Sequence, residues 1–324
     1  MSESLLEVRD LRVYFGSRER PVRAVDGVSF DMREGETVAL VGESGCGKSV
    51  TAMALSRLVP EPPGFYAGGE VLYRDQHVLQ LDERSLRDIR GNEISYIFQD
   101  PGASLNPVFR IGYQIREAIQ LHRPDDDAEH EVLELMQMVG MSDPQRAARA
   151  YPHELSGGMQ QRAMIAMALA CRPRVLIADE PTTALDVTIQ AQILELLVKL
   201  QAELGMAMLL ITHNLGLVAG VAHHVNVMYA GRIVESGETV DVLTRPRHPY
   251  TAGLLKAVPR LQGGDERLVG LEGTVPNPAG WPEGCRFAPR CPMRQPRCEA
   301  EDPPANRIAQ GRYSRCHFWE QLNP

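Results

Sequence analysis

The 324-residue sequence lacks a long apolar run, a signal peptide and an excess of basic charge. No segment approaches the roughly 18 consecutive apolar residues of a transmembrane helix, and the first residues lack the basic-then-apolar pattern of a signal peptide. With 23% charged residues and a net charge of −8, the chain has no overall basic character of the kind that nucleic-acid-binding proteins show. We therefore expect a soluble intracellular protein whose partners do not include nucleic acid.

The length suits one large domain with an appendage, or two domains. As far as about residue 240, the chain consists of short apolar runs separated by turns and of segments with apolar residues at helical spacing. Beyond that point proline and glycine become dense and the periodicity fades. No internal repeat is evident. We therefore predict an α/β domain over 1–244 and a C-terminal extension over 245–324.

A glycine-rich stretch after an apolar run is the strongest functional signal. The run 37–41 is typical of a strand and the residues after Ser49 are compatible with a helix, which is the setting that a phosphate-binding loop requires. Lys48 would reach the β- and γ-phosphate oxygens, and the Ser49 hydroxyl would complete the coordination of Mg²⁺. The residues expected to contact the nucleotide here are Gly42, Glu43, Ser44, Gly45, Cys46, Gly47, Lys48, Ser49 and Val50.

The segment that leads into this loop, residues 5–41, has the short apolar runs and turns of a small antiparallel sheet. Phe15, or failing it Tyr14, would stack on an adenine ring; the alternative is an aromatic side chain buried in the strand core. A further strand pair is predicted near 69–73 and 94–98. The part of the chain around the loop is therefore expected to be rich in strands.

A mostly helical insert is predicted over about 101–154. Apolar residues recur at helical spacing over 111–121 and 128–139, and the acidic run 125–127 separates them. The chain then returns to alternating strands and helices, a pattern typical of a parallel sheet covered by helices. The elements expected after the insert are strands at 175–178 and 207–212, a helix at 187–204, and a closing strand pair at 225–230 and 232–235.

Carboxylate, imidazole and amide side chains follow three of the predicted strands. Asp179 would hold Mg²⁺, and Glu180 would orient and polarise the attacking water. His213 would contact a γ-phosphate, and the Gln99 amide would coordinate the metal or the water. Each has an ordinary alternative, such as a solvated strand end or a structural histidine, and the upstream phosphate loop favours the catalytic interpretation.

A second anion-binding device follows the insert. Ser156, Gly157 and Gly158 precede a helix-like run, so they would expose another bare helix N-terminus. The phosphate loop already holds the nucleotide of its own chain. The second device is therefore most simply explained if it caps the nucleotide of a partner subunit in a head-to-tail dimer.

The order of these motifs resembles that of the ATPase cassette of ABC transporters over residues 5–240. The resemblance rests on the phosphate loop, Gln99, the Leu-Ser-Gly-Gly stretch at 155–158, Asp179-Glu180, Ala184-Leu185-Asp186 and His213. It implies an α/β fold of the P-loop NTPase (RecA-like) class, with an N-terminal antiparallel β subdomain, a helical subdomain and a cysteine-rich C-terminal extension. It also implies that the chain binds ATP and Mg²⁺, hydrolyses ATP, and uses Asp186 in the nucleotide site.

A narrower resemblance links the chain to ATPase subunits of oligopeptide, dipeptide and nickel importers. It rests on local stretches at 98–101, 104–107, 111–115, 248–251 and 254–255, and residues 45–51 favour the first of the two paralogous ATPases that such systems usually carry. The resemblance implies a paralogous second ATPase as heterodimer partner, two transmembrane permease subunits and an extracytoplasmic substrate-binding protein. It implies a peripheral position at the cytoplasmic face of the inner membrane, with 101–154 docked on the permeases.

Two other functions share the phosphate loop. A non-transport ABC ATPase of translation or DNA repair usually carries two cassettes in one chain or nucleic-acid-binding insertions, and this acidic chain has one cassette. A P-loop kinase or GTPase switch would leave residues 155–162 without a role. The ATP-driven importer is therefore the preferred interpretation.

Four cysteines lie in the last forty residues: Cys285, Cys291, Cys298 and Cys316. A cytosolic setting disfavours disulfides, and gaps of five, six and seventeen residues are wider than the tight pairs of structural zinc sites. Five neighbouring arginines would offset the charge of four thiolates: Arg286, Arg290, Arg294, Arg297 and Arg315. We expect a [4Fe–4S] cluster, as the resemblance to peptide-importer ATPases also suggests, with zinc or free buried thiols as the alternatives.

Overall fold

The computed structural model describes residues 4–124, 127–183, 185–257 and 271–322. The chain divides into two compact units. The first unit comprises residues 1–33, 37–79 and 211–324, and the second comprises 34–36 and 80–210. Among the described residues, no helix has the length and apolar character needed to cross a membrane.

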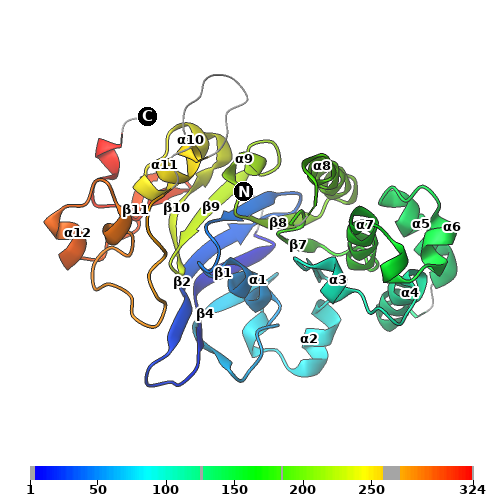
Figure 1. The fold of residues 1–324 in the computed structure, drawn as a ribbon. Coiled ribbons are helices and arrows are strands. Elements are labelled where there is room, and N and C mark those ends of the chain that lie inside the picture. Colours follow the sequence, from blue (N-terminus) through cyan, green and yellow to red (C-terminus); the bar gives the residue numbers. More distant parts are fainter. Residues whose placement is uncertain (1–3, 125–126, 184, 258–270, 323–324) are drawn as a thin grey trace. The chain divides into compact units, whose positions relative to one another are not determined.

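An antiparallel sheet of four strands begins the first unit (Figure 1). In spatial order its strands are β2 (Val22–Met32), β1 (Leu6–Phe15), β4 (Gly64–Tyr73) and β5 (Gln76–His77). Buried positions alternate with exposed ones along much of β2, so this strand turns one face to the core. The antiparallel sheet predicted from residues 5–41 is confirmed.

Further strands of the first unit surround the strand that precedes the phosphate loop. In spatial order they are β11 (Asn306–Ala309), β12 (Arg312–Ser314), β10 (Arg232–Glu238), β9 (His224–Tyr229) and β3 (Thr37–Val41). β3 runs parallel to β9 and is buried along its whole length, as a central strand requires. The other neighbours pair antiparallel, which includes the closing pair predicted before and after Gly231.

Short helices complete the first unit. They are α1 (Lys48–Leu55), α9 (Leu215–Val218), α10 (Thr239–Thr244), α11 (Pro249–Lys256) and α12 (Pro296–Ala300), with 3₁₀ turns at Val78–Gln80, Ala288–Arg290 and Trp319–Gln321. Tyr250 of α11 and Phe287 share a buried core with Tyr229 of β9 and with Val41 of β3. Residues beyond 245 therefore pack against the strand that leads into the phosphate loop.

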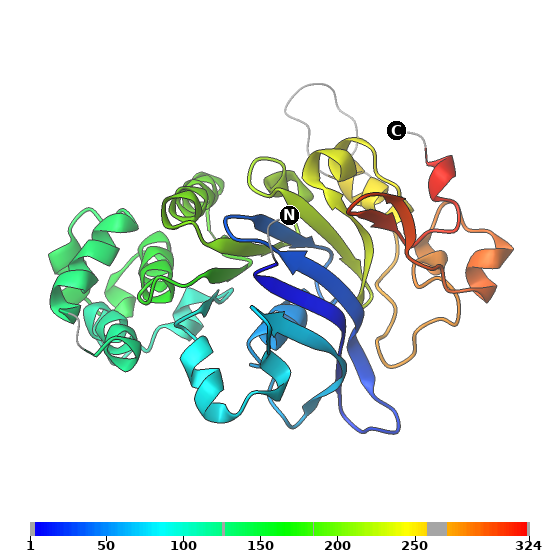
Figure 2. The same cartoon turned by 180° about the vertical axis from the view of Figure 1, so that it is seen from behind.

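The second unit combines strands with the helical insert (Figure 2). β6 (Ile94–Ile97) runs parallel to β7 (Val175–Asp179), and β8 (Ala207–Thr212), which begins in this unit, lies on the other side of β7. Its helices are α2 (Glu83–Ile89), α3 (Pro101–Ser104), α4 (Ile111–His122), α5 (Ala128–Met138), α6 (Pro144–Arg149), α7 (Gly157–Ala168) and α8 (Val187–Leu204), with a 3₁₀ turn at Pro152–Glu154. Figure 2 shows α4 to α7 packed together as the helical part.

Most predicted elements of the second unit agree with the structure, and one predicted strand pairing is wrong. α8 and β8 have the predicted bounds. The strands expected to pair near 69–73 and 94–98 belong instead to β4, which pairs with β1 and β5, and to β6, which pairs with β7. An apolar run marks a strand but does not identify its neighbour. Of the sequence features noted above, Asp125, Asp126 and Ala184 lie outside the described residues.

Candidate functional site

The loop between β3 and α1 has a backbone that only glycine permits at several positions. Gly45 and Gly47 have φ angles of +79° and +106°, and Gly47 is the N-cap of α1. A Cβ atom on Gly47 would lie 2.3 Å from the carbonyl oxygen of Ala24, and one on Gly42 would lie 2.2 Å from that of Met228. The glycines therefore allow the loop to pack closely on its surroundings, as a phosphate cradle must.

Lys48 holds its positive charge over this loop. The residue is only 4% exposed, and its Nζ donates hydrogen bonds to the carbonyl oxygens of Gly42 at 2.8 Å and Glu43 at 3.0 Å. Lys48 and the partly buried Ser49 form the first turn of α1, where the helix dipole is positive. The ammonium group and the helix terminus together favour an anion such as a phosphate.

Glu43 connects the loop to the C-terminal extension. Its backbone N–H donates to the hydroxyl oxygen of Tyr250, and its carboxylate pairs with the guanidinium of Arg290. The sequence analysis missed both roles: Tyr250 served only to support the family resemblance, and Arg290 was expected beside the thiolates. No local signal indicates these contacts, because more than 200 positions separate the partners in each.

The two aromatic residues considered for adenine stacking differ in their surroundings. The Tyr14 hydroxyl donates to Asp26 at 2.7 Å, and its ring meets that of Phe65 edge-on with centroids 6.0 Å apart. Phe15 lies partly buried at the end of β1. Tyr14 is thus committed to contacts within the sheet, which leaves Phe15 as the candidate for stacking.

The end of β7 carries the two carboxylates, and both have hydrogen-bond partners in the second unit. The Tyr96 hydroxyl donates to Asp179 Oδ2 at 2.7 Å, and Gln99 Nε2 donates to Glu180 Oε2 at 3.1 Å. Burial and the Asp179 charge raise the pKa of Tyr96, so its hydroxyl stays a neutral donor. The structure thus brings Gln99 to Glu180, and it adds Tyr96, which the sequence analysis missed.

Glu180 has a backbone conformation unusual for a residue with a long side chain. Its φ angle is +46°, in the left-handed region, and the Thr183 hydroxyl donates to its Oε2 at 2.9 Å. Such a conformation costs on the order of 1 kcal/mol and is found disproportionately at functional sites. The turn after β7 therefore holds Glu180 in a fixed, strained position.

Helix N-termini at the surface present other residues expected in the site. Ser156 is the exposed N-cap of the 12-residue helix α7, and its side chain makes no capping hydrogen bond. Gly157 is also exposed, and Gly158 is partly buried. Asp186 is the exposed N-cap of α8, again without a side-chain cap, and His213 is exposed just after β8. These side chains are accessible to a second molecule.

The candidate residues suit a magnesium nucleotide. The hydroxyl of Ser49 in the first unit, and the amide of Gln99 and the carboxylate of Asp179 in the second unit, are each oxygen donors of the kind that Mg²⁺ prefers. The glycines let the loop pack where a Cβ would collide with backbone, and Lys48 adds the charge that phosphate oxygens attract. The chemistry of these donors therefore suits Mg²⁺, and the loop with Lys48 suits the phosphates of a nucleotide.

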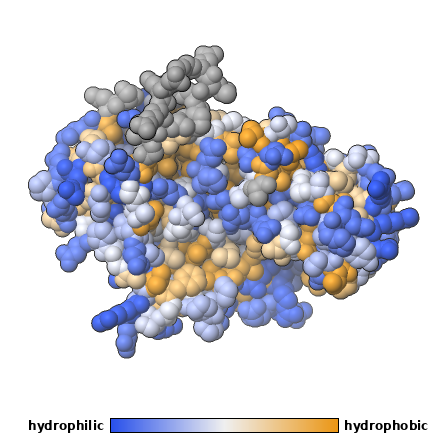
Figure 3. Space-filling view, viewed as in Figure 1, coloured by the Kyte–Doolittle hydropathy of each residue, from blue (hydrophilic) through white to orange (hydrophobic). Residues whose placement is uncertain are grey.

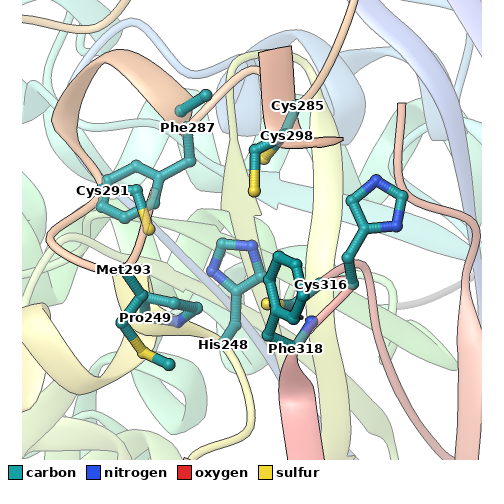
Figure 4. Close-up of a pocket in the computed structure, with 11 residues that line it drawn as sticks. His248, Pro249, Cys285, Phe287, Cys291, Met293, Cys298, Cys316 and Phe318 are labelled. Atoms are coloured by element: carbon teal, nitrogen blue, oxygen red, sulfur yellow. Dashed lines mark hydrogen bonds between the residues drawn. The ribbon is translucent and has the colours of Figure 1, made fainter. Parts of the chain in front are cut away.

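The four cysteines of the extension line one small cavity (Figure 4). His248, Phe287 and Met293 also line it, and its volume of about 10 Å³ is near the lower limit for one water molecule. Among the described residues, no group of three or more histidine, cysteine or carboxylate side chains could hold a metal ion. The predicted [4Fe–4S] cluster is therefore wrong, and nothing supports the zinc alternative.

The chemistry of these thiols explains the correction. Burial raises the pKa of Cys285 to about 11 and that of Cys316 to about 12, so both thiols are protonated at neutral pH in the fold without a metal. Four of the five arginines expected to offset a cluster pair with carboxylates instead: Arg286 with Asp26, Arg290 with Glu43, Arg294 with Glu299 and Arg297 with Glu301. All four cysteines are free.

Comparisons with known proteins identify two family models in the chain. Residues 25–183 match the ABC transporter model, and residues 234–298 match the model of the oligopeptide/dipeptide transporter C-terminal region. A solved dimeric ATP-binding cassette, in a post-hydrolysis state with ADP and Pi, superposes with a TM-score of 0.65 and 26% identity over 72% of this chain and 98% of its own. The cbiO1 protein of Clostridium perfringens superposes with a TM-score of 0.64 and 25% identity, over 75% of this chain and 92% of its own.

Similar proteins of known name cover nearly the whole chain. A dipeptide transport ATP-binding protein of Escherichia coli is 48% identical over 97% of each chain. A putative peptide import ATP-binding protein of Brucella ovis is 50% identical over 99% of this chain and 98% of its own. An oligopeptide transport ATP-binding protein of Bacillus subtilis is 47% identical over 98% of each. The chain therefore belongs to the ABC transporter ATPases, in the group that carries the oligopeptide/dipeptide transporter C-terminal region.

Proposed function

We propose that the chain is the ATP-binding and ATP-hydrolysing subunit of an ABC importer for peptides. The observation that carries this proposal is the 48% identity, over 97% of each chain, to a protein named for dipeptide transport. The B. subtilis relative is named for oligopeptides, so the cargo class is a short peptide. The non-transport alternative gains no support, because the similar proteins are named for import or transport along nearly their full length.

Each site residue has a distinct task in this proposal. The phosphate loop, with Lys48, binds the β- and γ-phosphates, and Phe15 stacks on the adenine. Ser49, Gln99 and Asp179 hold Mg²⁺, which would neutralise charge on the phosphate oxygens. Glu180 orients and polarises the attacking water, and its hydrogen bonds with Gln99 and Thr183 support a fixed orientation. His213 contacts the γ-phosphate.

The proposal includes a second ATPase subunit that completes each site. Ser156, Gly158 and Asp186 would act on the nucleotide of that partner across a head-to-tail dimer. The exposure of the α7 N-terminus and its lack of a side-chain cap support this assignment, since an uncapped helix N-terminus attracts an anion. The superposed cassette is a dimer. We propose a paralogous chain as the partner.

Residues 101–154 of the second unit are proposed to dock on two permease subunits at the cytoplasmic face of the membrane. Val108, Phe109 and Tyr113 are 70%, 43% and 40% exposed there, and the last two rings stack with centroids 4.9 Å apart. Figure 3 shows apolar side chains among the polar surface of this part. Exposed apolar surface of this kind suits a protein interface. An extracytoplasmic binding protein would deliver the peptide to the permeases.

The domain boundary near residue 244 remains part of this proposal. The family model for the extension begins at residue 234, and α11 begins at Pro249. We propose the division at 244 as the boundary between the ABC ATPase domain (1–244) and an oligopeptide/dipeptide-type extension that carries the four cysteines (245–324).

Reconstitution tests the proposed function. The chain is co-expressed with the second ATPase and the two permeases from neighbouring genes, purified, and placed in proteoliposomes with the binding protein. We expect little ATPase activity from the isolated chain, and an ATPase rate and peptide uptake that rise when a dipeptide is added with its binding protein. Recovery of a homodimer alone, or an ATPase rate that no peptide or nickel salt changes, would contradict the proposal. Stimulation by nickel alone would replace peptide as the cargo.

A further inference from the structure

Every polar group of one phosphate-loop residue, Glu43, is engaged by a residue elsewhere in the first unit. Its carbonyl oxygen accepts a hydrogen bond from Lys48 Nζ at 3.0 Å. Its backbone N–H donates to the Tyr250 hydroxyl at 2.9 Å. Its carboxylate oxygens lie 2.6 and 3.0 Å from two nitrogens of Arg290. Two of these three partners come from beyond residue 245.

The ion pair between Glu43 and Arg290 has the two-pronged geometry that makes such pairs strong. Both terminal nitrogens of the guanidinium meet the two carboxylate oxygens, so the pair fixes orientation as well as distance. The Arg290 side chain is 3% exposed and that of Glu43 is 32% exposed, so water screens the pair less than it screens a surface ion pair.

Arg290 is itself held in place by several contacts. Its Nε donates to the carbonyl oxygen of Glu272 at 2.9 Å, and one terminal nitrogen donates to that of Leu271 at 3.3 Å. Its guanidinium carbon lies 5.8 Å from the ring centroid of Tyr229. A cation fixed on three sides has already lost much of its rotamer freedom, so it orders Glu43 at little further entropic cost.

Tyr250 holds the backbone of the loop from the same extension. It is fully buried, and its ring packs against those of Tyr229 and Phe287 with centroids 4.7 and 5.4 Å apart. The hydroxyl therefore has a fixed position from which it accepts the Glu43 N–H. If the hydroxyl were removed, that amide would lose its partner.

We propose that Tyr250 and Arg290 are positioning residues for ATP binding, which set the conformation of the phosphate loop and the position of Lys48 through Glu43. This inference rests on the proposed function. Neither residue lies within 25–183, the part that matches the ABC transporter model, so the C-terminal extension contributes to the nucleotide site of its own chain. If either contact is lost, the loop must become ordered when ATP binds. The entropic cost of that ordering lowers the affinity for ATP.

The test measures the affinity of the purified full-length chain for Mg-ATP by calorimetry, together with thermal unfolding without nucleotide. Arg290→Met and Tyr250→Phe are each expected to weaken binding about 10-fold, the size typical of a lost charge-assisted or buried hydrogen bond. Arg290→Lys keeps the charge without the planar fork and is expected to fall between wild type and Arg290→Met. Tyr250→Phe keeps the packing of the ring, so it provides the measurement if Arg290→Met does not fold.

Arg297→Met is the matched control. Arg297 lies seven positions further along the extension and pairs with Glu301 at 2.8 Å, with both side chains more than half exposed. Its removal is expected to leave the affinity unchanged. A loss of affinity in Arg297→Met equal to that in Arg290→Met would overturn the proposal, because it would mean that any lost arginine of the extension weakens the fold.

A double-mutant cycle separates positioning from general stability. If Glu43 and Arg290 act together, Glu43→Gln and Arg290→Met combined should cost no more affinity than either alone. In the assembled transporter, Arg290→Met should raise the KM for ATP about 10-fold and change kcat less than 2-fold. Additive effects, or a fall in kcat at unchanged KM, would overturn the proposal.

Lys48→Ala distinguishes this inference from the proposed function. If Lys48→Ala loses ATP binding while Arg290→Met and Tyr250→Phe bind as wild type does, the positioning role is wrong and the nucleotide site stands. If Lys48→Ala also binds as wild type does, the nucleotide site itself is wrong, and the positioning role falls with it.

Discussion

Gln99 Nε2 and Glu180 Oε2 lie 3.1 Å apart, although 81 positions separate the two residues in the sequence. Gln99 follows β6 and Glu180 follows β7, and these strands are parallel neighbours. Their carboxyl ends meet at one edge of the sheet, where ligands of α/β proteins usually bind. The amide donates to the carboxylate and so limits its rotation. The residue expected to activate water is thus oriented by a residue expected to contact the metal.

Replacement of Glu180 by glutamine should nearly stop turnover while ATP still binds. The amide keeps the size of the side chain and loses the charge that polarises the attacking water, a loss that commonly slows a reaction on the order of 100-fold or more. The measurement compares the steady-state ATPase rate of the assembled transporter with the affinity for Mg-ATP. Glu195→Gln, on the exposed face of α8, is the control and should match wild type in both. A wild-type rate in Glu180→Gln would remove Glu180 from the catalytic role.

Replacement of Lys48 by alanine should weaken nucleotide binding itself. Lys48 is buried and provides a charge beside the loop, and lost hydrogen bonds to a charged group typically cost about 1.5–3 kcal/mol, or roughly 10- to 150-fold in affinity. Titration of the purified chain with Mg-ATP measures the change. Lys199→Ala, which removes an exposed lysine of α8, should bind normally. Equal affinities for the two variants would argue against the phosphate loop as the binding site.

An aspartate in place of Gly157 should separate folding from dimer-dependent catalysis. A Cβ at Gly157 would meet only Leu185 Cδ2, at an ordinary 3.6 Å, and an acidic residue in the first turn favours α7 by about 0.3–1 kcal/mol. The same charge would repel a phosphate bound by a partner subunit. We expect thermal stability equal to or slightly above that of wild type and unchanged ATP affinity in the isolated chain, with ATPase activity lost in the assembled transporter.

The control for this variant is Gly220→Asp, at an exposed glycine where a Cβ would meet nothing within 4 Å. It adds the same charge away from a helix N-terminus and should leave the ATPase rate unchanged. A transporter with Gly157→Asp that hydrolysed ATP at the wild-type rate would show that the α7 N-terminus does not act on a partner's nucleotide.

His248 should make the stability of the extension sensitive to acid. Its Nδ1 accepts from the Tyr250 N–H at 3.1 Å as the N-cap of α11, and complete burial lowers its pKa to about 3. The unfolded chain binds the proton near pH 6.5, whereas the folded chain binds it only near pH 3. The contribution of His248 to stability is therefore present above about pH 6.5 and is lost as the pH falls, by about 1.4 kcal/mol at pH 5.5.

A comparison with His248→Asn isolates this effect. Asparagine still caps a helix and does not titrate. Buried Glu235 has the opposite effect: burial raises its pKa to about 7, so its contribution to the stability of the folded chain increases as the pH falls. Because Glu235 is present in both wild type and His248→Asn, its effect cancels in the comparison. Urea unfolding at about pH 7.5 and 5.5 should show the advantage of wild type over the variant shrinking by about 1.4 kcal/mol. A constant difference would mean that His248 titrates normally in the fold.

The cysteines illustrate a limit of spacing arguments. Their gaps in the sequence measure how far the chain can reach between thiols, but whether four sulfurs converge on one ion depends on how the backbone between them packs. Here the segment packs around a cavity of about 10 Å³, and burial raises the pKa of Cys285 and Cys316. The neighbouring arginines pair with carboxylates such as Asp26 and Glu43, which lie hundreds of positions away.

The sequence by itself determined the order of strand, glycine-rich loop and helix around Lys48, the two carboxylates at the end of β7, and the bounds of α8 and β8, because these features depend on local interactions. These interactions extend over only a few residues, so they can be recognised from a single sequence. They include glycine at a position with positive φ, apolar residues at a helical or strand period, and glycine after the last turn of a helix. The motif order then supported the family, which the comparisons confirm.

Only the tertiary structure decided which distant residues meet. The pairing of β4 with β1, the hydrogen bond from Gln99 to Glu180, and the contacts of Tyr250 and Arg290 with Glu43 join segments that have no local signal for each other. Burial of apolar side chains brings distant segments together, and buried polar groups then pair with one another. For Tyr250 and Arg290 this core is the cluster around Tyr229 and Phe287. A given residue is compatible with many different long-range partners. Which partner it contacts therefore depends on how the whole chain folds.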